Sequence, residues 1–299
     1  MGTKVRLVFY ARSAEDADAG RKAAFAVMKR VDDLMSDYKP DSELSRLSAA
    51  AGKGPQKVSQ ELFDVLQSSL LTAEQSAGAF DITVGPLVRL WRRSRKERKL
   101  PSPEELAQAK ALIGYRRLRL DAAARTAQLD TPGMILDLGG IAKGYACDRA
   151  LAALRELGIS SALVDTGGGM ALGEPPPGKP GWRIGMLGDD SKILELSRCG
   201  VSTSGDIEQF VEIDGVRYSH IIDPATGLGL TNQAMATVIA KDGLTSDALD
   251  TPICILGAGR GLKMAVDNGA EAWTQWIENK RRKRAQTPGF SRYVVPAED

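Results

Sequence analysis

The sequence is poor in the features that mark disulfide-bonded, membrane-spanning and repeat proteins. Its 299 residues include only 3 cysteines, and Cys147, Cys199 and Cys254 are odd in number, widely spaced and without metal-ligand spacing. That pattern argues against a disulfide framework. No apolar run approaches the length of a membrane span, no targeting segment is visible, and no repeat or low-complexity tract occurs.

Neither sign of charge dominates, since the net charge is +2. Residues 91–99 and 280–284 form dense basic runs that could contact nucleic acid or an anionic membrane. The rest of the chain carries balanced charge and no nucleic-acid motif. We therefore interpret both runs as solvated loop or helix faces and expect no nucleic-acid partner.

The composition is that of an enzyme-sized globular protein. With 43% hydrophobic and 26% charged residues, the chain is long enough for one large α/β domain or two lobes. Apolar periodicity predicts helices and strands mixed along the chain, and nothing marks a clean domain boundary. The expected helices cover 14–37, 60–77, 141–157 and 259–268, and the expected strands are a hairpin over 116–131 and segments at 162–164, 182–222 and 235–240.

The most informative segment is DLGGIAKGYACD at 137–148, in which Asp137 and Lys143 flank a glycine-rich turn that opens a helix. Glycines let backbone N–H groups approach an anion closely, and the start of a helix favours negative charge, so the segment suits a bound phosphate. Its spacing fits neither a P-loop nor GxGxxG. Taken alone, such glycines more often serve only to supply positive φ in a strand-to-helix turn.

A second segment, YSHIIDPATG at 218–227, holds the only histidine of the chain. His220 titrates near neutrality and can act as a general base or acid, although a lone histidine is more often structural. Residues 223–227 are typical of a turn, and they follow a strand-like run at 216–222. Sites are often built on turns that follow strands.

A third segment, TSDALDT at 245–251, places Asp247, Asp250 and Thr251 on one face of a helical turn. Two carboxylates and a hydroxyl are the hard oxygen ligands that Mg²⁺ takes, usually beside waters and phosphates. Helix capping by the first residues of the segment is the competing interpretation. Pro252 indicates a helix that is unusual or only beginning there.

In these three segments the chain resembles the flavin transferases of the ApbE family, which take FMN from FAD and attach it to a threonine of another protein. Nearly the whole chain is covered, by motifs in order at family-like intervals. They lie at residues 1–3, 38–46, 78–91, 137–148, 202–206, 220–227, 247–251 and 257. The resemblance implies an α+β fold: a single compact domain over residues 1–299, formed by two intertwined α/β lobes with FAD bound between them.

The resemblance also implies roles for the matching residues. His220 would be the catalytic base, with Asp223 orienting its ring. Magnesium would be bound by Gly140 through its carbonyl group, by Asp247 and Thr251, and with Asp250 close by. Contacts to FAD would come from Met1, Tyr38, Ala79, Phe80, Asp81, Asp137, Lys143, Thr203, Ser204, Gly205 and Ile222.

The implied reaction is Mg²⁺-dependent transfer of the FMN part of FAD to a threonine hydroxyl of an acceptor flavoprotein, with release of AMP. The implied partners are FAD and an acceptor of the FMN-binding domain type. Because family members are commonly exported, we expect export by a leader that this chain lacks, with membrane contact only through that leader or a lipid anchor; a cytoplasmic location stays open. Two alternatives keep the same site: FAD pyrophosphohydrolysis to FMN and AMP, and non-catalytic carriage of FAD.

The chain departs from the family pattern at two positions. Where the family often has Gly-Gly-Asp, this chain has Gly169, so a carboxylate is absent. Pro252 stands where relatives usually have a small helix-forming residue, and it is expected to shift Thr251 relative to Asp247.

Overall fold

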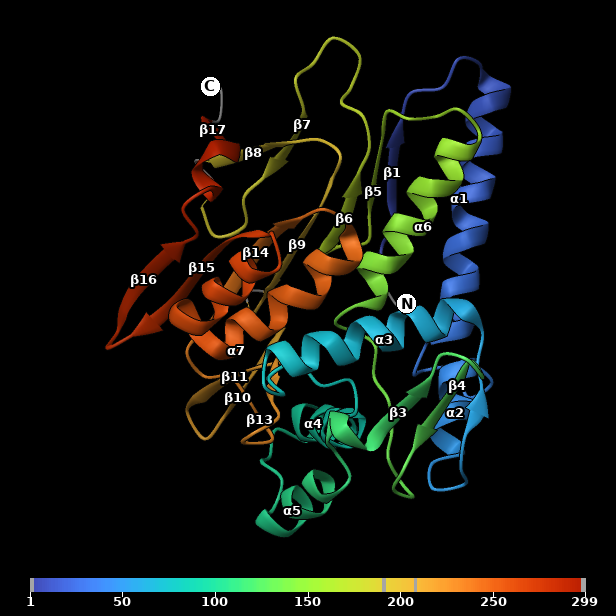
Figure 1. The fold of residues 1–299 in the computed structure, drawn as a ribbon. Coiled ribbons are helices and arrows are strands. Elements are labelled where there is room, and N and C mark those ends of the chain that lie inside the picture. The colour runs from blue at the N-terminus through green and yellow to red at the C-terminus, as the bar shows by residue number, and fades with distance from the viewer. Residues whose placement is uncertain (1–2, 190–191, 207–208, 297–299) are drawn as a thin grey trace.

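A seven-stranded antiparallel sheet runs across the molecule in Figure 1, from β1 at one side to β16 at the other. The structure is a computed structural model and describes residues 3–189, 192–206 and 209–296. Along the sheet the strand order is β1-β5-β6-β9-β14-β15-β16. These strands are β1 (Arg6–Phe9), β5 (Ala162–Asp165), β6 (Gly169–Leu172), β9 (Cys199–Gly205), β14 (Met235–Ala240), β15 (Glu271–Glu278) and β16 (Arg281–Gln286).

The remaining strands form small sheets and hairpins around the large one. Sheet β17-β8-β7 packs its apolar side chains against one face of the large sheet, with Phe290 fully buried between them. These strands are β2 (Gln56–Lys57), β3 (Leu118–Asp121), β4 (Thr126–Leu129), β7 (Trp182–Gly185), β8 (Lys192–Leu196), β10 (Phe210–Ile213), β11 (Val216–Ser219), β12 (Ile222–Asp223), β13 (Leu228–Gly229) and β17 (Val294–Pro296).

Helices α1, α6 and α7 pack on the large sheet, and α6 also packs along both α1 and α7. The other helices lie in the lower part of Figure 1. The helices are α1 (Ala14–Met35), α2 (Glu43–Ala49), α3 (Gln60–Gln75), α4 (Gly85–Glu97), α5 (Pro103–Ala111), α6 (Ala142–Glu156) and α7 (Gly243–Asp267), with short 3-10 segments η1 (Tyr115–Arg117) and η2 (Phe290–Tyr293).

The chain forms two lobes that are intertwined, as expected. Strand β1 is part of the large sheet, and helix α1 packs on that sheet. Residues 36–137 then form the second lobe, and the chain returns to the large sheet through α6. The second lobe has its own apolar core around Leu44, Leu62, Leu129 and Met134, and that core is closed by residues of α6 and α7. The start of α6 and the first half of α7 therefore lie where the two lobes meet.

Most of the expected elements are confirmed, but the helix that carries the third motif is longer than Pro252 suggested. It begins at Gly243, where Asp242 caps it by accepting a hydrogen bond from Thr245 N at 2.8 Å, and it continues through Pro252. The break comes at Gly257, whose φ of 71° is not helical. The expected helix at 259–268 is the part of α7 beyond this break. Asp247, Asp250 and Thr251 thus sit in regular helix ahead of the proline.

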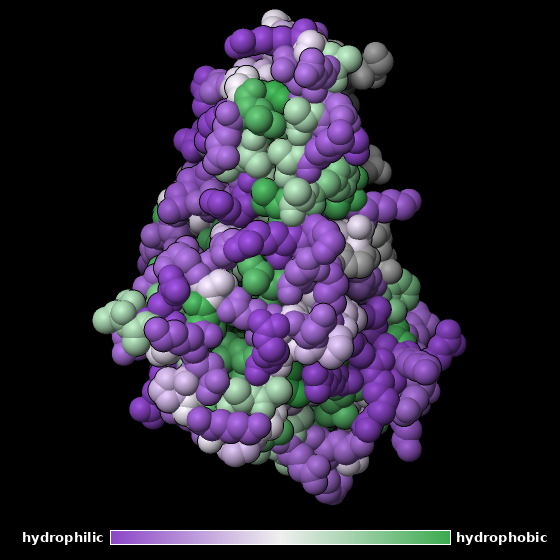
Figure 2. Space-filling model, turned by 90° about the vertical axis from the view of Figure 1, so that its right-hand side faces the viewer, coloured by the Kyte–Doolittle hydropathy of each residue, from purple (hydrophilic) through white to green (hydrophobic). Residues whose placement is uncertain are grey.

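The face of the molecule shown in Figure 2 is mostly hydrophilic, with hydrophobic residues gathered in small separate patches. Among the helices described, none combines the length and apolar character needed to cross a membrane.

Candidate active site

Two carboxylates of α7 lie buried beneath strand β9. The side chains of Asp247 and Asp250 belong to residues that are only 2% and 3% exposed, and Ser202 of β9 joins them. Its hydroxyl donates to Asp250 Oδ2 at 2.6 Å and lies 3.4 Å from Asp247 Oδ1. Burial and the neighbouring charge of Asp247 raise the pKa of Asp250. Burying two like charges away from water costs free energy unless a cation neutralises them.

The first turn of α6 places a lysine beside this pair. Lys143 Nζ lies 3.4 Å from Asp247 Oδ1 and donates to the carbonyl of Gly139 at 2.6 Å, while Gly144 N donates to Asp247 Oδ2 at 2.9 Å. Burial would lower the pKa of Lys143, but the charges of Asp247 and Asp250 raise it. When both carboxylates are ionised, one lysine leaves this pair with an excess of negative charge.

Hydroxyl and carbonyl groups surround the same pair. Thr251 Oγ1 donates to Asp250 Oδ1 at 3.1 Å and lies 3.1 Å from Ser204 Oγ. A Cβ on Gly140 would stand 3.9 Å from Thr251 Oγ1 and 3.4 Å from the Phe80 ring, which brings the glycine-rich turn against α7. The structure therefore brings Gly140, Lys143, Ser204 and Thr251 together with both aspartates.

This donor set fits Mg²⁺ better than a transition metal. Across the described ranges no group of three or more His, Cys, Asp or Glu side chains is placed to hold a metal ion, so hydroxyls, a carbonyl group, waters or a ligand must complete the coordination. Oxygen donors with two carboxylates are what Mg²⁺ takes, and it usually keeps waters and substrate phosphates as further ligands.

His220 lies between β11 and β12 and is held by a backbone carbonyl. Its Nδ1 lies 3.2 Å from the carbonyl oxygen of Gln209, which also accepts from His220 N at 3.0 Å. A carbonyl oxygen can only accept, so Nδ1 carries the proton and Nε2 is left as the acceptor. Burial lowers the pKa of His220, and the positive charges of Arg95 and Lys143 lower it further. The ring is therefore neutral at neutral pH, as a general base must be.

Asp223, which was expected to orient this ring, has a hydrogen-bond partner in its own turn. Asp223 Oδ1 accepts from Ala225 N at 2.8 Å and so fixes its own turn, in which Gly227 has a φ of 80°. The group that contacts the ring nitrogen is the carbonyl of Gln209. That carbonyl comes from a loop eleven residues earlier in the chain, and no sequence spacing signals that contact.

The rim of the site carries Arg92, which belongs to the basic run at 91–99 and is not simply solvated. Arg92 of α4 pairs with Asp37 at 2.7 Å and with Asp137 at 3.3 Å, and its guanidinium lies 4.3 Å from the centre of the Tyr38 ring. Tyr38 is 71% exposed and presents its ring outward. Burial and the nearby Asp37 raise the pKa of Asp137. These residues form one polar and aromatic rim on the second lobe.

Two adjacent residues of the predicted FAD set, Phe80 and Asp81, have partners within the protein. Phe80 is buried in the core of the second lobe. Asp81 uses both oxygens: Oδ1 accepts from Thr83 N and Oγ1, and Oδ2 accepts from Tyr115 N at 2.9 Å. Ala79 is partly exposed beside them. Asp81 therefore shapes the loop, whatever ligand that loop contacts.

Strand β9 sorts its hydroxyls onto two faces. Ser202 and Ser204 point to α7, whereas Thr203 Oγ1 lies 2.9 Å from Thr237 Oγ1 on the opposite face of the sheet. Alternation along a strand requires this split, so the side chain of Thr203 points away from the two buried aspartates and that of Ser202 points toward them. Gly205 packs against Met235, and Ile222 packs near Trp91. Met1 lies outside the described residues.

Gly169, the first departure from the family pattern, lies against the same cluster. A Cβ there would be 3.6 Å from Gly144 N and 3.7 Å from Ser202 Oγ. A side chain at this position would point toward the two buried aspartates. Its absence leaves the cluster with two carboxylates.

Comparison with known proteins agrees with the resemblance read from the motifs. The ApbE family matches residues 1–274. A protein named FAD:protein FMN transferase from Klebsiella pneumoniae is 32% identical over 307 residues, covering 99% of this chain and 87% of its own length. A protein of the same name from Vibrio cholerae is 36% identical, covering 81% and 75%.

Solved structures show the same fold. The flavin transferase ApbE from Vibrio cholerae superposes with a TM-score of 0.88 at 30% identity, covering 98% of this chain and 96% of its own. The apo form of the flavinyl transferase ApbE from Pseudomonas stutzeri gives a TM-score of 0.83 at 31% identity, with 97% of each chain covered. The expected α+β fold is confirmed.

Proposed function

This chain belongs to the ApbE family, and from that premise we propose that it transfers the FMN part of FAD to a threonine hydroxyl of an acceptor protein in a Mg²⁺-dependent reaction. The relatives from Klebsiella pneumoniae and Vibrio cholerae are named FAD:protein FMN transferase, which supports FAD as the donor and a protein as the acceptor. The observation that carries the proposal is the buried pair Asp247 and Asp250, set beside Lys143 and Thr251 at the junction of the lobes.

The buried pair supplies the magnesium site of the proposal. Asp247 and Thr251 would hold the ion through their side chains and Gly140 through its carbonyl, with Asp250 beside them. When bound, Mg²⁺ would polarise the pyrophosphate of FAD and neutralise charge that develops on its oxygens. Lys143 adds a fixed positive charge at the same place, which favours binding of a phosphate.

FAD would lie along the junction of the lobes. Its aromatic part would rest on the exposed ring of Tyr38, and Asp137 would accept hydrogen bonds from hydroxyl or amino groups. Arg92 would fix both residues in place through its contacts to them. The proposal keeps the remaining predicted contacts, which are Met1, Ala79, Phe80, Asp81, Thr203, Ser204, Gly205 and Ile222.

The transfer step uses His220 as the base. Its Nε2 would take the proton of the acceptor threonine hydroxyl as that oxygen attacks the FMN-side phosphorus. The bond from this phosphorus to the bridging oxygen breaks, and AMP leaves with that oxygen. Such a transfer depends mostly on positioning and charge neutralisation, to which base catalysis adds on the order of 10²–10⁴-fold.

Export and an acceptor of the FMN-binding domain type complete the proposal, and both rest on the family resemblance. Fractionation of cells that produce the full-length protein would locate it.

The direct test incubates the protein with FAD, Mg²⁺ and a threonine-bearing FMN-binding domain. Transfer gives covalent flavin on the domain and one AMP per flavin bound. Free FMN and AMP without covalent flavin would favour the hydrolase alternative, and intact FAD after long incubation would favour the carrier. The His220→Ala protein is the matched control, because it removes the base and leaves the buried aspartates untouched.

A further inference from the structure

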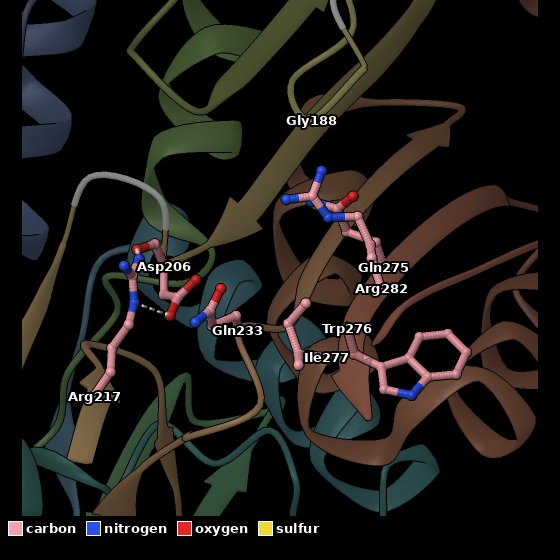
Figure 3. A pocket seen from close by; sticks show the side chains of 8 residues that line it. All are labelled: Gly188, Asp206, Arg217, Gln233, Gln275, Trp276, Ile277 and Arg282. Atoms are coloured by element: carbon pink, nitrogen blue, oxygen red, sulfur yellow. Dashed lines mark hydrogen bonds and ion pairs between the residues drawn. The ribbon is translucent and has the colours of Figure 1, made fainter. Parts of the chain in front are cut away.

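A cavity of about 290 Å³ lies at one end of the large sheet, and none of the residues assigned to FAD lines it. Asp206 enters it from the end of β9, Arg217 from β11, and Gln275 and Arg282 from β15 and β16 (Figure 3). The turn after β7 covers it through Gly188. Several segments that are distant in the sequence thus meet at the cavity, and its lining is mostly polar.

The floor of the cavity holds an acceptor without a donor. Gln275 is only 6% exposed, and within the described part of the chain its Oε1 makes no hydrogen bond. Its Nε2 faces the sulfur of Met235 at 3.9 Å, a contact that suits the N–H end of the amide. A buried carbonyl oxygen that lacks a donor costs stability. A ligand with an N–H or O–H group would satisfy it.

The cavity is shaped around this amide. Gly188 has a φ of 84°, and a Cβ on it would stand 2.9 Å from Gln275 Nε2. Only a glycine lets the turn cross Gln275 this closely in this conformation. The same turn is held in place by Arg284, which donates to Gly188 O and pairs with Asp189, both at 3.3 Å.

A free cation stands at the mouth. Arg282 is exposed, and in the ranges that the structure describes its guanidinium makes no ion pair or hydrogen bond, whereas Arg284 on the same face of β16 is bound to the turn. Figure 3 shows the Arg282 side chain on the Gln275 side of the cavity. Lys283 points to the other face of the strand, since side chains alternate. The cavity therefore offers one positive charge and one hydrogen-bond acceptor.

The opposite wall connects the cavity to the catalytic base. Arg217 donates to Asp206 Oδ2 at 3.1 Å and to Asp206 O at 2.7 Å, which ties hairpin β10–β11 to the end of β9. The same hairpin leads into His220 three residues later, and the negative charge of Asp206 raises the pKa of His220 against the effect of burial. Ser204 of β9 lies two residues before Asp206 and contacts Thr251, one of the residues proposed to bind magnesium. A chain segment in the cavity would thus lie beside the residues that act on the threonine.

We propose that this cavity binds the segment of the acceptor protein next to its threonine, with an acidic side chain of that segment paired to Arg282 and an N–H or O–H group donating to Gln275 Oε1. The inference rests on the proposed function and adds the partner's recognition chemistry to it. An acidic segment suits the excess of positive charge on β16, whose residues Arg281–Arg284 are all exposed.

The test compares charge reversals on the two faces of β16. The probe is the FMN-binding domain used above, and the readouts are KM for the domain, kcat and FAD affinity. Arg282→Glu is expected to raise KM for the domain about tenfold and to leave FAD affinity unchanged, because an attractive pair becomes repulsive. Lys283→Glu, with the same change of charge on the other face, is the matched control and should leave KM unchanged. Changing to Lys an acidic residue of the domain near its threonine should restore KM with the Arg282→Glu protein.

A second variant separates recognition from folding. Gln275→Met keeps the size of the side chain and removes the unpaired oxygen. If the oxygen serves the acceptor, this variant raises KM while its melting temperature stays equal or rises. A lowered melting temperature with unchanged KM would show that water or the fold already satisfies Gln275, and would overturn its role.

The outcomes are distinguishable from failure of the proposed function. If the unaltered protein attaches no FMN to the domain, the proposed function fails, and this inference fails with it. If the unaltered protein labels the domain and Arg282→Glu and Lys283→Glu give the same KM, the cavity does not recognise the acceptor. Equal loss of binding to anionic vesicles in both variants, with KM unchanged, would instead assign β16 to a membrane surface.

Discussion

Replacing Asp250 by Asn tests whether the buried aspartates form a magnesium site. The amide can still accept from Ser202 or Thr251, whose hydroxyls now reach its carboxylate at 2.6 Å and 3.1 Å. The substitution removes one of two buried like charges, and burial together with Asp247 already raises the pKa of Asp250. We therefore expect the metal-free protein to melt at the same temperature or higher, and to lose most of its response to Mg²⁺.

The size of that response follows from mass action. An ion that binds only the folded state stabilises it by about 2.7 kcal/mol at a hundredfold excess over Kd. For a chain of this length, each kcal/mol raises the melting temperature by roughly 2 °C. The unaltered protein should therefore gain about 5 °C at saturating Mg²⁺, and the Asp250→Asn protein only a small part of it.

The assay is thermal unfolding of chelator-treated protein as MgCl₂ is added back. Asp148→Asn is the matched control, because Asp148 is also a carboxylate shielded from water, half-buried, with a pKa raised by burial to about 6. Its oxygens accept from Gly243 N and Leu244 N at 2.7 Å and 2.8 Å, outside the proposed site. That variant should melt lower and keep the full Mg²⁺ shift. An equal Mg²⁺ shift in the Asp250→Asn and unaltered proteins would refute the site.

Three further predictions concern the base, the helix contact and the rim. Because burial lowers the pKa of His220, the single-turnover rate of the unaltered protein should rise with pH below the ordinary imidazole value of about 6.5. The His220→Ala protein should lose both that rise and most of the rate. An unchanged pH profile in the variant would make the residue structural. Gly144→Ala would place a Cβ 2.7 Å from Asp247 Cβ, so it should lower the melting temperature and transfer together, whereas Gly259→Ala, with nothing within 4 Å, should not. Arg92→Met should weaken FAD binding about tenfold in fluorescence titration with kcat nearly unchanged, and equal FAD affinity would remove it from the rim.

Local signals in the sequence predicted elements well where neighbouring residues decide the structure. The helix expected at 14–37 is found at Ala14–Met35, where Ser13 caps it by accepting from Asp16 N, and the strand at 235–240 is confirmed. Pro252 was a misleading signal for the course of α7. A proline removes one hydrogen bond from a helix, but packing between α7 and the sheet outweighs that loss. Tertiary contacts overrode local propensity there.

Residues whose partners lie far along the chain were missed. Arg92 looked like one of many surface charges, and only folding brings it to Asp37 and Asp137, which are 55 and 45 residues away. Ser202 could have been found from strand alternation, since it shares a face with Ser204. The carbonyl of Gln209 could not, because a backbone group leaves no trace in residue type.

The central claim is transfer of FMN to a threonine hydroxyl, and mass spectrometry of the acceptor domain tests it most directly. After incubation with FAD, Mg²⁺ and the unaltered protein, the domain should carry one added FMN joined through a phosphoester to a threonine, and the His220→Ala protein should leave it unmodified. A domain of unchanged mass beside free FMN and AMP would contradict transfer.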